Sequence, residues 1–209
     1  LQVIDTKNCL RYTGRLLTDV KVGPGPDFIR KRLESVGMNS INNVVDITNY
    51  VMMELGQPMH AFDLAHLKGS KVAIDKAKAG EKFVSLDGTE LTLTGQELTI
   101  RDQERPVCLA GVVGGKNSGV SESTKSVFLE SAHFAMDSVR KTARAFGLQT
   151  DSAYRFSRGT DPSGVLQAQE LACMLLQKYA GATVAADFYD EYPSPMKKTP
   201  IEITLTQVT

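Results

Sequence analysis

The spacing of the apolar residues switches along this chain between helix-like and strand-like, and this alternation is the strongest constraint on its fold. In residues 26–37 and 43–56, apolar side chains recur every three or four positions and a glycine ends the run, which predicts two helices. Residues 137–147 and 161–181 show the same pattern and predict two more. Polar residues are expected to cap the second and third helices, namely Asn43 and Asp137.

Between the second and third helices the pattern is that of short strands. The predicted strands are residues 71–77, 83–84, 91–93, 98–100, 106–113 and 126–130. Asp87-Gly88 is typical of a type I′ turn and predicts an antiparallel hairpin. The segment 106–113 is almost wholly apolar, so we expect a strand that is buried on both faces. Strands in the middle of the chain with helices on either side predict a mixed α/β fold.

Composition and charge exclude several classes of protein. The 209 residues are 42% hydrophobic and 23% charged, which is typical of a globular chain with one large or two small domains. No apolar run has the length of a membrane span and no signal pattern opens the chain, so we expect a cytoplasmic protein. The 24 basic and 24 acidic side chains cancel, so RNA can be bound only through local basic groupings. Such groupings are Arg140, Lys141 and Arg144, and Arg155 and Arg158.

Nucleotide-binding and metal sites are disfavoured. Residues 110–117 come nearest to a phosphate-binding loop, but Ala110 replaces its first glycine and Asn117 replaces the hydroxyl residue that would hold magnesium. The three histidines have no paired cysteines or dense carboxylates beside them, which argues against zinc. The three cysteines stand far apart and are expected to be reduced core thiols, namely Cys9, Cys108 and Cys173.

Two polar positions stand out against the apolar pattern. His60 follows the second helix in a glycine- and proline-containing turn, where it could form a cluster with Thr48 and Asn49 of that helix. Glu130 ends an apolar strand, and strand ends are where functional residues gather. The pattern alone favours a structural role for both residues, with His60 as a helix cap or structural hydrogen-bonding group and Glu130 in a partly exposed salt bridge.

A resemblance to a known family changes this balance. Five blocks of residues look like the signature segments of the bacterial phenylalanyl-tRNA synthetase beta subunit, in the family's order. The blocks are NNVVDITNY at 42–50, LGQPMHAFD at 55–63, LAGVVGG at 109–115, LESAHF at 129–134 and TDSAYRFSRG at 150–159. A related module occurs in some tRNA lysidine synthetases. The resemblance implies that residues 1–192 are the editing, tRNA-binding domain, and that the proline-rich residues 193–209 are a linker and the start of a following module. The residue pattern itself predicts a strand at 201–205 that belongs to whatever follows.

The resemblance also implies a fold and an activity. The fold of the family is a three-layer α/β arrangement that contains a β-sandwich of unusual topology flanked by helices. The activity of this region is post-transfer editing, which hydrolyses tyrosine wrongly esterified to phenylalanine tRNA. The partners would be the acceptor end of that tRNA and the alpha subunit, and no membrane. No cofactor is expected in this fragment, since the ATP and magnesium of the whole synthetase serve aminoacylation on the alpha subunit.

By the same resemblance, Glu130 binds the tyrosine phenol with help from backbone N–H groups near Gly111. His60 and Asn49 orient the hydrolytic water. The pocket is lined by Thr48, Pro58, Thr150 and Ser152. The chain departs from the family at Ser152, which puts a hydroxyl where many relatives carry a methyl, and at Ser157, which replaces a glutamate and loses an ion pair. The alternative is a noncatalytic module that packs against the alpha subunit or orients tRNA, which the zero net charge mildly favours.

Overall fold

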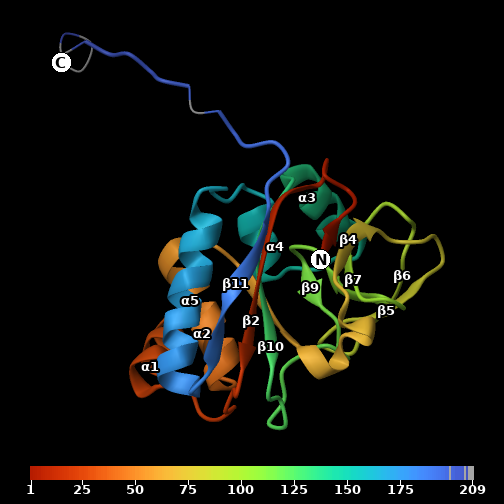
Figure 1. Ribbon diagram of the computed structural model, residues 1–209. Coiled ribbons are helices and arrows are strands. Elements are labelled where there is room, and N and C mark those ends of the chain that lie inside the picture. The colour runs from red at the N-terminus through yellow and green to blue at the C-terminus, as the bar shows by residue number, and fades with distance from the viewer. Residues whose placement is uncertain (198, 205, 207–209) are drawn as a thin grey trace.

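A computed structural model describes residues 1–197, 199–204 and 206 and has three layers (Figure 1). A four-stranded sheet lies in the middle, with helices on one face and a five-stranded sheet on the other. One apolar core fills the space between the two sheets, and a second lies between the four-stranded sheet and the helices. The structure therefore confirms the expected α/β fold with a sandwich of two sheets flanked by helices.

The central sheet has the order β11-β2-β10-β3 and is antiparallel throughout. Its strands are β2 (Cys9–Thr18), β3 (Met59–Asp63), β10 (Val127–Phe134) and β11 (Thr183–Glu191). The eight residues of β10 are all buried, because this strand is covered on both faces. Successive side chains of a strand point to opposite faces. Phe128, Ala132 and Phe134 accordingly belong to the core between the sheets, whereas Val127 and Leu129 belong to the core beneath the helices.

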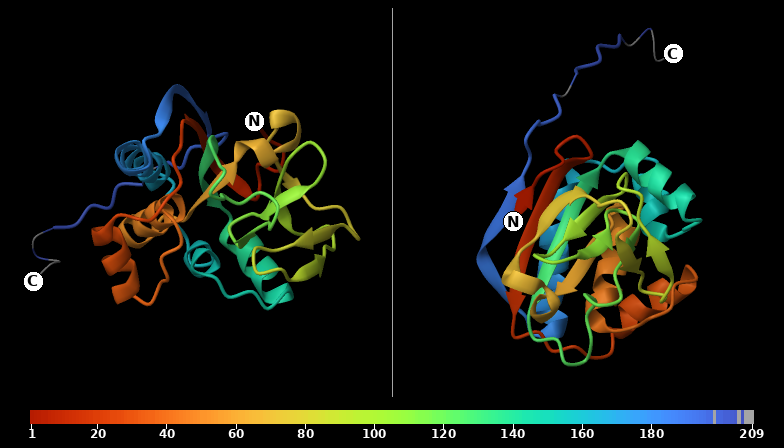
Figure 2. Two further views of the ribbon diagram at one scale, coloured as in Figure 1. Left: turned by 90° about the horizontal axis from the view of Figure 1, so that it is seen from below. Right: turned by 90° about the vertical axis from the view of Figure 1, so that its right-hand side faces the viewer.

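The outer sheet has the order β1-β4-β7-β8-β9, and the β5-β6 hairpin extends beyond it (Figure 2). Its strands are β1 (Gln2–Val3), β4 (Ala73–Lys76), β7 (Leu98–Arg101), β8 (Pro106–Leu109) and β9 (Val113–Gly114). The hairpin consists of β5 (Lys82–Val84) and β6 (Glu90–Thr92). Only the β1-β4 pair is parallel, and residues 77–97, which include the β5-β6 hairpin, connect β4 to its antiparallel neighbour β7.

Five α-helices and two short 3₁₀ helices complete the described part of the chain. They are α1 (Asp27–Ser35), α2 (Asn43–Leu55), η1 (Leu64–His66), η2 (Lys68–Ser70), α3 (Met136–Ala145), α4 (Asp151–Phe156) and α5 (Gly164–Ala180). Helices α2 and α5 pack on the central sheet and on each other, and α1 packs on α2. Val139 of α3 and Phe156 of α4 reach the core between the sheets. None of the described helices is long and apolar enough to cross a membrane.

The predicted helix ends are mostly confirmed, but two caps were wrong. Gly56 and Gly181 end α2 and α5 in the left-handed conformation, as their positions predicted. The N-cap of α2 is Asn42, whose side chain accepts hydrogen bonds from two backbone N–H groups, while the Asn43 amide is turned to the carbonyls of other segments. Helix α3 starts at Met136 without a side-chain cap, and Asp137 lies in its first turn.

The strand predictions need several corrections. The predicted strand 106–113 reverses after β8, because Gly111 adopts φ +71° and the Val112 N–H bonds back to the Leu109 carbonyl. The hairpin at Asp87-Gly88 exists, but only Gly88 has positive φ, so the turn is not type I′. Strand β10 continues four residues beyond Glu130. Strands β1, β2, β3 and β11 were not predicted. No strand forms at 201–204, and residue 205 lies outside the described residues.

The thiol predictions are confirmed. Cys9, Cys108 and Cys173 are buried and free, and burial raises the pKa of each thiol above its ordinary value. These residues are therefore packed as small apolar groups rather than exposed as nucleophiles.

Candidate functional site

Strands β3 and β10 place the two singled-out polar residues side by side. His60 is paired directly with Glu130 across the antiparallel ladder, so their Cβ atoms are about 5 Å apart, as in such pairs generally. Both side chains point into the space between the two sheets. His60 therefore belongs to a strand and not to the predicted turn, and Glu130 lies in mid-strand and not at a strand end.

The two residues line a small cavity between the sheets, here called the inner pocket. Its volume is about 80 Å³. It is lined by residues 58–60 at the start of β3, 111–114 around the turn after β8, and Cys108, Glu130, Phe134, Ser152 and Phe156. Five residues predicted for the site meet here, namely Pro58, His60, Gly111, Glu130 and Ser152.

Glu130 is a buried carboxyl group without a partner. It is 4% exposed and makes no hydrogen bond or ion pair within the described part of the chain. Burial raises its pKa from 4.5 to about 8, because water no longer stabilises the charged form. The Tyr12 hydroxyl, also buried and without a hydrogen bond, lies near enough to interact electrostatically with Glu130. The carboxyl group is thus poised to take a hydrogen-bonding ligand.

His60 is perturbed in the opposite direction. Its Nε2 atom is buried without a hydrogen-bond partner, and burial lowers its pKa from 6.5 to about 4. The ring packs edge-on against Phe62, with 4.4 Å between ring centroids. The imidazole is therefore neutral at pH 7 and can accept a proton or position a water molecule.

A glycine makes room for this imidazole. A Cβ atom on Gly114 would stand 2.6 Å from His60 Cε1 and 3.0 Å from the Leu86 side chain. Glycine at this position of β9 is therefore needed for the His60 ring to lie where it does.

We predict that Gly114→Ala displaces the His60 ring toward solvent. The pKa of His60 should rise from about 4 toward its ordinary 6.5, and unfolding stability should fall by about 1–3 kcal/mol through overpacking. NMR titration of the histidine rings and urea unfolding measure the two effects. Gly23→Ala is the matched control, because nothing lies within 4 Å of its added Cβ. An unchanged His60 pKa in Gly114→Ala would contradict the close contact.

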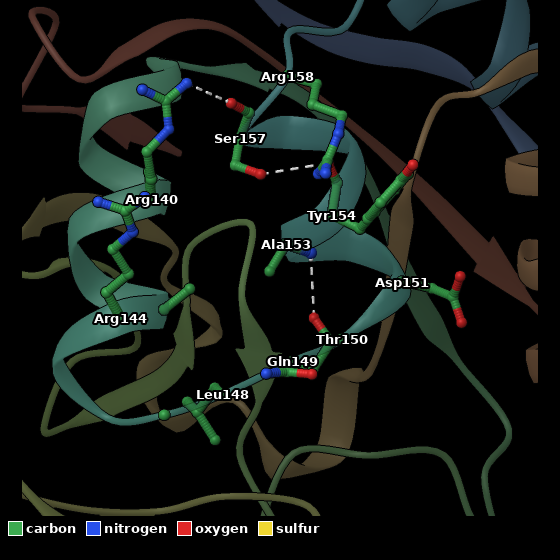
Figure 3. Close-up of a pocket in the computed structure, with 12 residues that line it drawn as sticks. Arg140, Arg144, Leu148, Gln149, Thr150, Asp151, Ala153, Tyr154, Ser157 and Arg158 are labelled. Atoms are coloured by element: carbon green, nitrogen blue, oxygen red, sulfur yellow. Dashed lines mark hydrogen bonds between the residues drawn. The ribbon is translucent and has the colours of Figure 1, made fainter.

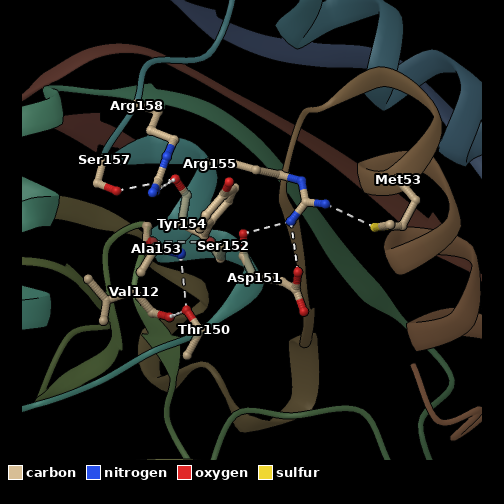
Figure 4. A network of polar contacts seen from close by, with 11 residues as sticks. Met53, Val112, Thr150, Asp151, Ser152, Ala153, Tyr154, Arg155, Ser157 and Arg158 are labelled. Atoms are coloured by element: carbon tan, nitrogen blue, oxygen red, sulfur yellow. Dashed lines mark hydrogen bonds and ion pairs between the residues drawn. The ribbon is translucent and has the colours of Figure 1, made fainter. Parts of the chain in front are cut away.

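Helix α4 fixes the turn that carries Gly111 (Figure 4). The Ser152 hydroxyl donates to the Gly111 carbonyl at 3.1 Å, and the Thr150 hydroxyl donates to the Val112 carbonyl at 2.7 Å. Thr150 also caps the helix by accepting from the Ala153 N–H. The Gly111 N–H itself bonds to nothing within the described residues. The Ser152 hydroxyl therefore holds the wall of the pocket.

The structure does not bring every predicted residue to the inner pocket. The Thr48 hydroxyl donates to the Val45 carbonyl within α2, and Thr48 is buried there. Asn49 is half-buried on α2, makes no hydrogen bond within the described part of the chain, and does not line the pocket. It lies one helical turn from Met53, which contacts Arg155 of α4 (Figure 4). Asn49 thus faces the side of the molecule on which α4 lies.

The pattern of the sequence missed a second, larger cavity, here called the outer cleft. It is open, has a volume of about 860 Å³ and lies between α3 and α4 (Figure 3). It is lined by Arg140, Ala143, Arg144, residues 147–151, Ala153, Tyr154, Ser157 and Arg158. The basic grouping on the third predicted helix was a signal for it. That α3 and α4 pack together could not be read from the sequence.

Comparisons with known proteins identify the family. A model of the B3/4 domain family matches residues 8–181. The chain is 60% identical over 200 residues to the phenylalanine–tRNA ligase beta subunit of Bdellovibrio bacteriovorus, covering 96% of this chain and 25% of that protein. It is 48% identical over 194 residues to the corresponding subunit of Geobacter sulfurreducens, covering 93% of this chain and 24% of that protein. The chain thus spans about a quarter of the length of these curated relatives.

A solved structure shares the fold. The crystal structure of an N-terminal fragment of the phenylalanyl-tRNA synthetase beta subunit from Pyrococcus horikoshii superposes with a TM-score of 0.56 at 13% sequence identity. The match covers 88% of this chain and 49% of that one. Since the family model covers most of the chain, the chain belongs to the B3/4 domain family.

Proposed function

We propose that this chain is the editing region of a phenylalanine–tRNA ligase beta subunit and hydrolyses tyrosine esterified to phenylalanine tRNA. The observation that carries the proposal is the pairing of His60 with Glu130 in one pocket. The Glu130 carboxyl group is buried, the His60 ring is half-buried with its Nε2 atom shielded from solvent, and neither side chain makes a hydrogen bond within the described residues. Two neighbouring ionisable groups with pKa values shifted in opposite directions are typical of a reactive site.

A second site is needed because a phenylalanine pocket cannot reject tyrosine strongly. A hydrophobic pocket discriminates only about a hundredfold against an analogue that adds a hydroxyl group. The inner pocket offers the reverse selectivity. Its wall includes the apolar rings of Phe134 and Phe156, and Glu130 supplies the polar partner for a phenol. The Gly111 N–H can donate to the same phenol oxygen.

In the proposed reaction, water attacks the ester carbonyl carbon, the ester C–O bond breaks, and the products are tyrosine and the free ribose hydroxyl. His60 orients the water, and the neutral imidazole can take up its proton. Asn49 lies on α2 outside the inner pocket, so in this proposal its side chain contacts the water from α2. An aminoacyl ester is activated, so neither a nucleophilic side chain nor a metal ion is needed for this step. The proton returns to the leaving ribose oxygen.

The inner pocket must widen to admit an aromatic ring. Its volume is about 80 Å³, whereas an engineered cavity that holds benzene measures about 150 Å³. Leu86, at the tip of the β5-β6 hairpin, packs against Gly114 beside His60 and is 51% exposed. Leu86 does not line the pocket, but displacement of its side chain would free space beside Gly114 and His60 into which the pocket can widen.

Two partners and a location follow from the proposal. The substrate is the aminoacylated acceptor end of phenylalanine tRNA, and the alpha subunit supplies the aminoacylation site whose errors are corrected. This chain and the alpha subunit would both act on tRNA during translation, so the proposed location of the chain is the cytoplasm. Much of the affinity for tRNA would come from the rest of the synthetase, since the chain has no net charge.

The test is hydrolysis of tyrosyl-tRNA(Phe) by the parent chain and by His60→Ala and Asn49→Ala. Each variant should slow hydrolysis by about 100-fold, the lower end of what a positioned acid–base group contributes. Rates are normalised to the folded fraction, because His60 lies on β3 and its replacement also removes packing against Phe62. His66→Ala is the matched control, since His66 is an exposed histidine at the end of η1.

If folded His60→Ala and Asn49→Ala hydrolyse the ester at the parental rate, neither residue takes part in the reaction. Failure of the parent to hydrolyse the ester, either alone or within the complete synthetase, would favour the noncatalytic alternative.

A further inference from the structure

The outer cleft concentrates positive charge in a protein with no net charge. Arg140 and Arg144 of α3 face Arg158 across it (Figure 3). Arg144 is exposed and makes no hydrogen bond or ion pair within the described residues. Arg140 forms a 3.4 Å ion pair with exposed Asp137 and donates to the Ser157 carbonyl. The acidic residue of the cleft, Asp151, is already paired with Arg155 at 2.9 Å (Figure 4). The guanidinium charges are therefore available to an anion.

An aromatic ring stands among these charges. Tyr154 of α4 is 57% exposed, and the Arg158 guanidinium lies over its ring at 3.6 Å from the centroid. Arg158 also donates to the Tyr154 carbonyl, which holds the two side chains together. A flat surface made of an aromatic ring and a guanidinium plane is the kind on which unpaired nucleic-acid bases stack.

The outer cleft and the inner pocket share one wall. Ser152 and Phe156 of α4 line the inner pocket, whereas Tyr154 and the residues beside it line the outer cleft. A helix is about 10 Å across. A linear polymer bound in the outer cleft can therefore have its end near the inner pocket.

We propose that the outer cleft binds the single-stranded 3′ end of an RNA, with phosphates on Arg140 and Arg144 and a base stacked on Tyr154. This inference rests on the proposed function, because it takes the aminoacylated nucleotide beyond α4 into the inner pocket. The cleft volume of about 860 Å³ is enough for one or two nucleotides. Double-stranded RNA does not fit this chemistry, since its bases are stacked on one another and cannot reach Tyr154.

Binding is measured by fluorescence anisotropy with a labelled single-stranded RNA that ends in CCA, over a range of salt concentrations. Arg144→Ala should weaken binding several-fold and reduce the slope of log K against log salt by about 0.7, the contribution of one phosphate on a single strand. Tyr154→Ala should weaken binding about 10-fold without changing that slope, and Tyr154→Phe should restore it.

Controls separate this site from general attraction to RNA. Arg32→Ala removes an exposed arginine from another arginine–aromatic cluster, in which Arg32 bonds to Tyr50, and should leave binding unchanged. A blunt RNA hairpin without a single-stranded end should bind more weakly than the CCA strand. Equal binding of the two RNAs, or parental affinity in both Arg144→Ala and Tyr154→Ala, would overturn the proposal.

The outcome does not depend on the hydrolytic activity, because the labelled RNA carries no ester. The two proposals are separated further with 3′-O-tyrosyl adenosine, which has no upstream phosphate. Arg144→Ala should leave kcat on this small ester unchanged and raise KM on tyrosyl-tRNA several-fold. A raised KM on both substrates would place Arg144 in the inner pocket's reaction and contradict a separate RNA site.

Discussion

Glu130→Ala is expected to remove the selectivity of hydrolysis between tyrosyl and phenylalanyl esters. In the structure the carboxyl group is buried without a hydrogen bond, so the unfavourable free energy of burying it is already present in the empty pocket. A phenol that bonds to it gains about 1–3 kcal/mol over a phenyl ring, which corresponds to a preference of roughly 5- to 150-fold. Without the carboxyl group the rates on the two esters should converge, mainly because that on tyrosine falls.

Glu130→Gln is the sharper variant. With a pKa of about 8, Glu130 is mostly protonated at pH 7, and glutamine has nearly the shape and hydrogen-bonding capacity of a neutral carboxyl group. The variant should therefore keep part of the preference for tyrosine at pH 7. Its hydrolysis of both esters is measured beside that of Glu130→Ala.

Glu97→Gln is the matched control. Glu97 is also a buried glutamate, 3% exposed, but its carboxylate bonds to Thr94 and to the Gly95 N–H in a loop of the outer sheet. Glu97→Gln should change the free energy of unfolding without changing the preference for tyrosyl over phenylalanyl esters. If Glu130→Ala keeps the parental preference, the phenol is read elsewhere in the pocket, where Ser152 is the next candidate.

The sequence predicted four of the five α-helices in the described part of the chain, because their ends are local, and it missed α4. Glycine in the left-handed conformation ends α2 and α5 where the apolar periodicity stops, and no distant contact is needed to place it. Strand β11 escaped prediction because most of its residues are exposed, so no alternation of apolar residues marks it. It forms because β2 offers a free edge, which is a long-range property.

The difference between local and long-range features also explains which parts of the site were predicted. The signature blocks supplied five of the residues that line the inner pocket. The pairing of His60 with Glu130 depends on the register of β3 against β10, which the single sequence does not encode locally. The expected cluster of Thr48, Asn49 and His60 assumed a turn that brings His60 back onto α2, whereas the chain enters a strand at Met59. The outer cleft depends on how α3 meets α4, and this packing leaves no local sign in the sequence.

The second large effect expected is on the pH dependence of stability. The pKa of Glu130 is about 8 in the folded chain and 4.5 ordinarily. Between pH 4.5 and 8, Glu130 is therefore protonated in the folded state and ionised in the unfolded state. Its contribution is therefore present at low pH and is lost as pH rises from about 4.5 to 8, and amounts to roughly 5 kcal/mol in total. For His60 the folded pKa of about 4 lies below the ordinary 6.5, so stability is lost as pH falls from 6.5 to 4.

These two slopes oppose each other below pH 6.5, and only that of Glu130 remains above it. Urea unfolding of the parent should therefore show a nearly constant free energy between about pH 5 and 6.5, then a decline of about 2 kcal/mol by pH 8. In Glu130→Gln the decline above pH 6.5 should disappear. The free energy of unfolding should instead rise from pH 5 to 6.5, because burial lowers the pKa of His60 and, less strongly, of His133. The variant should overtake the parent in stability as pH rises. A parent curve that stays level from pH 6.5 to 8.5 would mean that Glu130 is charged and hydrated in solution, and the buried, unpaired carboxyl group on which tyrosine recognition depends would then be absent.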